Sequence, residues 1–127
     1  MAHSRLLEVA ATMAITLALA APALAHEAAK GRNGGLRVDA GKYHTELIVD
    51  GTTNVVVFLS DADDKPLAAA GFKGTAILVL DGKSERIALE AADGSRLVGK
   101  APVPVKVGVK GVVQLTAPDG ATAQGKF

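Results

Sequence analysis

Short runs of β-branched and aliphatic residues, each closed by a turn signal, fill most of this 127-residue chain. Asn54–Ser60 reads Asn-Val-Val-Val-Phe-Leu-Ser, and Tyr43–Val49 sends successive side chains to two opposite faces. The turn signals between such runs are Asp50-Gly51, Asp81-Gly82, Asp93-Gly94 and Asp119-Gly120. No stretch from residue 36 onward shows convincing helical periodicity. The pattern predicts about seven or eight short strands in one all-β domain, an Ig-like antiparallel β-sandwich in preference to a small barrel.

The alternation along the strands predicts an aliphatic core. Tyr43, Leu47 and Val49 share one face of their strand, which we assign to the core. The core residues that we expect are Leu47, Val49, Val55, Val57, Leu59, Ile77, Val79, Ile87, Leu89, Val107, Val113 and Leu115. This assignment leaves His44 and Glu46 together on the opposite, open face of the strand.

The start of the chain has the order of a secretory signal peptide. Arg5 precedes an apolar run over residues 9–21, and Pro22 and Ala25 supply a helix breaker and a small residue before His26. The run is shorter than the roughly 20 residues that a membrane-spanning helix needs, so we expect cleavage after Ala25 and no stable membrane insertion.

These features predict three segments in an exported protein, with the periplasm as its compartment. The segments are a signal peptide over residues 1–25, a flexible arm over 26–35 and a β-sandwich domain over 36–127.

The composition and the absence of certain motifs exclude several classes of function. The formal net charge is +1 without a basic block, which gives nucleic-acid binding no support. Cysteine is absent, so disulfides and thiolate metal sites are excluded. Ser60, Ser84 and Ser95 have no nearby grouping of a histidine with an acid that would make them nucleophiles. We therefore expect a binding protein and not an enzyme.

Cleavage after Ala25 would place a free α-amine and an imidazole on His26. Together they can chelate one metal ion, and their ordinary pKa values of about 7.7–8.0 and 6.5 allow both nitrogens to bind near neutral pH. Nitrogen-rich sites favour Cu(II) among the divalent ions of the first transition row. A frayed terminus that binds nothing is the alternative.

His44 and Glu46 form the second candidate for a metal site. In a strand their side chains share one face, and the glycine-containing arm could fold back to bring His26 to them. The amine, His26 and His44 would then make a three-nitrogen copper site with Glu46 as a weak oxygen ligand. A solvated polar face of the strand is the alternative.

The acidic turn after the strand at 54–60 is a third candidate. Asp61 or Asp63 could supply a carboxylate near the copper ion, although the turn lacks the glycine and the distal glutamate of an EF-hand loop. Turn acids that are simply solvated are the alternative.

Part of the chain resembles a known group of proteins. The segments Asn33-Gly34-Gly35, Tyr43-His44-Thr45-Glu46-Leu47 and Asp61-Ala62-Asp63-Asp64-Lys65-Pro66 carry the likeness. They resemble small bacterial periplasmic proteins and segments in the periplasmic adaptor subunits of heavy-metal efflux systems. In that pattern, histidines stand where this chain has Asn33 and Ala62. The resemblance implies a β-sandwich near copper or other heavy-metal traffic.

Two functional hypotheses follow. The first is a periplasmic copper-binding protein for sequestration or delivery, with His26, His44, Glu46, Asp61 and Asp63 as the candidate ligands. The second is a metal-free interaction module that docks an efflux adaptor or another envelope protein.

Overall fold

The computed structural model describes residues 28–127, which form antiparallel β-strands and no helix. The strands are β1 (Ala29–Lys30), β2 (Leu36–Ala40), β3 (Tyr43–Ile48), β4 (Asn54–Ser60), β5 (Lys73–Leu80), β6 (Lys83–Ala91), β7 (Arg96–Lys100), β8 (Gly111–Thr116) and β9 (Thr122–Lys126). The prediction of an antiparallel all-β domain is confirmed.

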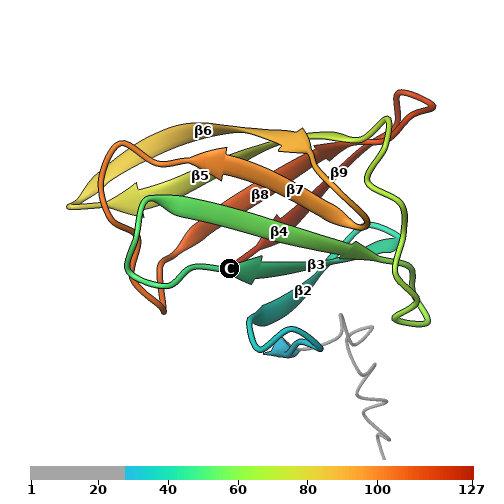
Figure 1. The fold of residues 1–127 in the computed structure, drawn as a ribbon, viewed down its shortest axis with the longest axis horizontal. Helices are drawn as coiled ribbons and strands as arrows, with labels where there is room; N and C mark the ends of the chain where they lie inside the picture. The colour runs from blue at the N-terminus through green and yellow to red at the C-terminus, as the bar shows by residue number, and fades with distance from the viewer. Residues whose placement is uncertain (1–27) are drawn as a thin grey trace, which may run out of the picture.

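The strands close into a barrel, whereas the sequence favoured a sandwich. Their order is β1-β2-β3-β4-β7-β6-β5-β8-β9, and pairing of β2 with β9 closes an eight-stranded ring to which β1 adds at one side (Figure 1). Closure depends on Gly125, which pairs with Ala40. A Cβ atom at Gly125 would lie 2.8 Å from the Thr45 hydroxyl oxygen, so a side chain there would hold β9 away from β2.

The barrel encloses one aliphatic core, and most of the expected core positions are inside it. Two differences stand out. In β5 the buried residues are Ala76, Leu78 and Leu80, whereas Ile77, also expected in the core, is only partly buried and Val79 is 48% exposed. Every residue from Ala76 to Leu80 is apolar, so no polar residue marked the outer face of this strand.

Val107, also expected in the core, is 82% exposed because residues 101–110 form a loop and not a strand. Pro102 and Pro104 cannot donate to a sheet ladder. The loop instead covers one end of the barrel. Val105 is fully buried, and its backbone N–H donates to the Thr52 carbonyl at 2.8 Å.

Two tight hairpins set the register of the strands. Asp81 and Gly82 join β5 to β6 with φ values of 49° and 78°, which is the two-residue turn that Asp-Gly predicts. Gly41, with φ of 58°, and Lys42 join β2 to β3. The second hairpin fixes Asp39 opposite His44 and Arg37 opposite Glu46.

Candidate functional site

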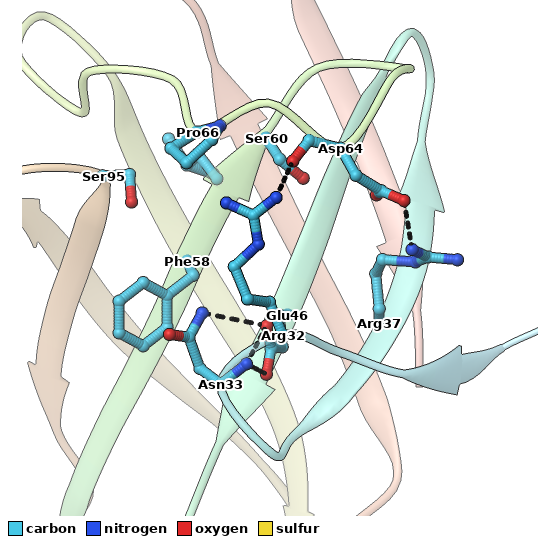
Figure 2. A pocket seen from close by; sticks show the side chains of 10 residues that line it. Arg32, Asn33, Arg37, Glu46, Phe58, Ser60, Asp64, Pro66 and Ser95 are labelled. Atoms are coloured by element: carbon cyan, nitrogen blue, oxygen red, sulfur yellow. Dashed lines mark hydrogen bonds and ion pairs between the residues drawn. The ribbon is translucent and has the colours of Figure 1, made fainter.

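His44 and Glu46 lie on the outer face of β3, as the alternation predicts, but neither is open to solvent. Each is 5% exposed. The cover comes from two segments far apart in the sequence, the loop Gly31–Gly35 and the turn Asp61–Pro66 (Figure 2). The segment before β2, expected as part of a flexible arm, contributes β1 and this loop.

Glu46 holds the loop through its carboxylate. The oxygens accept hydrogen bonds from the backbone N–H of Asn33 at 2.9 Å, the side-chain amide of Asn33 at 3.1 Å and the N–H of Gly35 at 2.8 Å. The loop can approach so closely because residue 31 is glycine, where a Cβ atom would lie 2.1 Å from Glu46 Cδ. These bonds offset the cost of burying the carboxylate.

His44 is held between two carboxylates. Its Nδ1 lies 2.5 Å from Asp64 Oδ1, and its Nε2 lies 3.1 Å from Asp39 Oδ1. The other oxygen of Asp64 pairs with the Arg37 guanidinium at 2.5 Å. The hydrogen bond with His44 lowers the pKa of Asp64 below its ordinary value, against the effect of partial burial, and the charge of Arg37 acts in the same direction as His44.

The structure does not bring all of the expected metal ligands together. Asp61 turns its carboxylate inward to its own loop, where Oδ1 accepts from the N–H groups of Asp63 and Lys65, each at 2.9 Å. Asp63 is exposed, and the aspartate of this turn that reaches His44 is Asp64. His26 lies outside the described residues.

Sequence reasoning did not select Asp39, Arg37 or Asn33, and within the acidic turn it favoured Asp61 and Asp63 over Asp64. For Asp39 and Arg37 a signal existed, because a two-residue hairpin at Gly41-Lys42 fixes their partners on β3 by counting. For Asp64 and Asn33 the sequence held no such signal, because the positions of these residues depend on how two loops fold over the outside of the barrel.

The donor set in the described residues does not fit a metal ion as it stands. No group of three or more His, Asp or Glu side chains in residues 28–127 is arranged to hold one. The two nitrogens of an imidazole point away from each other, so Asp39 and Asp64 lie on opposite sides of the His44 ring and cannot ligate one ion with it. Glu46 already accepts from the loop.

A polar recess of about 270 Å³ opens beside these networks. Figure 2 shows the Arg32 side chain rising from the loop toward the turn, where its Nη2 donates to the Asp64 carbonyl at 3.0 Å. Phe58, Ser60, Pro66 and Ser95 form the other walls.

A second surface lies where the loop 101–110 meets β2, β3 and β5. The large hydrophobic residues that are exposed in the described chain are Leu36, Val79 and Val107. Leu36 and Val107 line a groove of about 360 Å³, and Val107 and Val79 line an adjoining hollow of about 280 Å³. We call this surface, with the exposed lysines at its rim (Lys30, Lys106 and Lys110), the valine–lysine surface.

No known protein family, curated protein or solved structure matches the chain. Residues 28–127 contain no helix long and apolar enough to cross a membrane.

Proposed function

We propose that this protein is an exported, non-catalytic interaction module that docks an acidic partner protein of the periplasm. The observation that carries the proposal is the valine–lysine surface, where the exposed large hydrophobic residues of the described chain gather around Val107. Exposed apolar groups joined in one patch mark interaction sites on soluble proteins more often than scattered ones do.

The lysines define the partner. Lys30, Lys106 and Lys110 outnumber Asp81, the acidic residue that lines these hollows. Complementary charge at the rim of an interface speeds association and selects partners, while the apolar centre supplies most of the affinity. A partner segment with apolar residues flanked by Asp or Glu fits this surface. The resemblance noted above makes an efflux adaptor the first candidate partner.

Affinity capture with matched variants tests this proposal. Val107→Asp places a charge in the centre of the surface, and because Val107 is 82% exposed, the fold should tolerate it. Arg86→Asp, at an exposed position of β6 outside these hollows, is the control.

Captured envelope proteins should bind the unaltered chain and Arg86→Asp but not Val107→Asp, and should dissociate as salt is raised. Equal capture by Val107→Asp would overturn the proposal.

Copper binding through His26 is the second candidate, and one observation favours it. Ala29, where β1 begins, pairs with Arg37, two residues along β2 from Asp39 and its partner His44. The mature terminus would therefore join the fold close to the one imidazole in the described residues. The His26 amine and imidazole would supply two nitrogens. His44 would supply the third nitrogen, its Nδ1, after the Asp64 carboxylate in its partly exposed turn breaks its hydrogen bond with that atom.

Intact mass spectrometry of the exported protein with one equivalent of Cu(II) tests this candidate. It requires a chain that begins at His26 and a retained copper that is lost on N-terminal acetylation and weakened in His44→Gln. A different mature terminus, or copper retention that acetylation leaves unchanged, would exclude the chelate. Neither result bears on the valine–lysine surface, so the two candidates are separable.

A further inference from the structure

The recess on the outer face of β3 and β4 is a separate feature from the valine–lysine surface. Its walls come from four places in the sequence: the loop Gly31–Gly35, β2 with β3 and β4, the turn Asp61–Pro66, and Ser95 between β6 and β7. Because Glu46 and Asp64 pin the two covering segments to β3, the walls are fixed by internal bonds. A recess built in this way is preformed, which lowers the cost of binding a ligand.

Each charged side chain that lines the recess, except Arg32, has its charge either paired with an opposite charge or satisfied by hydrogen bonds. Arg37 pairs with Asp64, and Glu46 accepts from the N–H groups of its loop. Arg32 donates to a backbone carbonyl, a neutral acceptor, and within residues 28–127 no carboxylate lies within ion-pair distance of it. In Figure 2 its guanidinium lies close to Pro66 and Ser60, on the side of the recess formed by the turn.

We propose that this recess binds a small organic monocarboxylate, with Arg32 as the residue that recognises it. A guanidinium has five N–H donors and binds a carboxylate through two parallel bonds, and one donor of Arg32 is engaged by Asp64. The Ser60 and Ser95 hydroxyl groups line the same space as further donors, and Phe58 and Pro66 give the organic part an apolar wall. A volume of about 270 Å³ restricts the ligand to small molecules.

The surrounding charge favours a monocarboxylate over phosphate. Glu46 and Asp64 balance Arg37 and Arg32, so one added negative charge meets a neutral surrounding. A dianion would meet about twice the repulsion from Glu46 and Asp64 that a monocarboxylate meets.

NMR titration of the ¹⁵N-labelled mature chain with benzoate tests this site. We expect saturable shifts in the amide signals of residues 31–37, 58–60 and 95. Benzamide, which is neutral and of the same shape, should cause none, and inorganic phosphate should bind at least tenfold more weakly. Arg32→Gln should weaken benzoate binding at least tenfold, Arg32→Lys should weaken it less, and Arg86→Gln on β6 should leave it unchanged.

Three results would overturn the proposal: equal shifts with benzamide, equal binding of benzoate by Arg32→Gln, or shifts spread over all exposed lysines and arginines. Val107→Asp should leave the titration unchanged, so failure here is distinguishable from failure of the docking proposal.

Discussion

Single residues decide how the outer face of β3 is covered, and Glu46 is the most important of them. Its carboxylate is an acceptor for three donors from the loop Gly31–Gly35. In Glu46→Gln the acceptor loses its charge and one of its two oxygens becomes an NH₂ group, so the part-buried backbone N–H groups of Asn33 and Gly35 are left to share one neutral oxygen. Such a loss costs about 1–3 kcal/mol.

We therefore expect Glu46→Gln to lower the free energy of unfolding by about 1–3 kcal/mol, measured by urea denaturation. Glu90→Gln, at an exposed position of β6, is the matched control and should change it by less than about 0.5 kcal/mol. A Glu46→Gln value within the control range would mean that the loop is held by other contacts.

Asp64 gives the fold a pH dependence whose sign is fixed by its contacts. His44 and Arg37 lower the pKa of Asp64 below the ordinary 3.8, so the unfolded chain takes up a proton at a higher pH than the folded chain does. The resulting stability is present above the ordinary pKa and is lost as the pH falls through the lower folded value. Since the side chain is 43% exposed, solvent screening keeps the effect modest.

Thermal unfolding between about pH 5 and pH 2 should show a smaller loss of stability on acidification in Asp64→Asn than in the unaltered chain. Asparagine tolerates the left-handed backbone of this position, where φ is 61°. Asp93→Asn, at an exposed position between β6 and β7, serves as control. Some dependence will persist, because the Thr52 hydroxyl also lowers the pKa of Asp50. Parallel curves for Asp64→Asn and the unaltered chain would contradict the assignment.

At the scale of elements, the sequence predicted the structure correctly where a polar residue shows which face of a strand points outward or where a turn residue shows where the strand ends. The alternation in Tyr43–Ile48 put His44 and Glu46 on the correct face, and Asp81-Gly82 located a hairpin. The prediction failed in the second half of β5, where the continuous apolar run from Ala76 to Leu80 does not show which residues face inward. It also failed for burial on the outer face of β3, because the cover is supplied by loops and not by strand pairing.

Closure of the barrel between β2 and β9 depends on Gly125. A Cβ atom at this position would meet Thr45 Oγ1 at 2.8 Å and Val38 Cγ2 at 3.0 Å, so Gly125→Val forces β9 away from β2. We expect a loss of about 1–3 kcal/mol in the free energy of unfolding, the usual cost of overpacking. Gln124→Val, at an exposed position of the same strand, is the control and should stay within about 0.5 kcal/mol. Equal effects of the two substitutions would show that β9 does not depend on a close approach at Gly125.

At the scale of the whole molecule, the barrel consists of two blocks of four strands joined by short seams. One block is β2, β3, β4 and β7, and the other is β5, β6, β8 and β9. The seams are the pair Ala40 with Gly125 and the pairs of Glu90 and Ala91 with Val98 and Leu97. These short seams close the two blocks into a barrel, whereas the sequence favoured an Ig-like sandwich. The pattern of strands along the sequence cannot predict these seams. One depends on the absence of a side chain at Gly125, and the other depends on where β6 and β7 meet.

The seams also predict where the molecule opens first. β4 and β5 are paired on both sides along most of their length, whereas β9 is paired fully with β8 but with β2 only at Gly125. Local opening requires less free energy where fewer backbone hydrogen bonds and less buried surface are lost. Native-state hydrogen exchange should therefore give the amides of β9 a lower free energy of opening than those of β4 and β5, and Gly125→Val should widen the difference. Equal protection of β9 and β5 would mean that the barrel opens as one cooperative unit and that the seams are as strong as the long ladders.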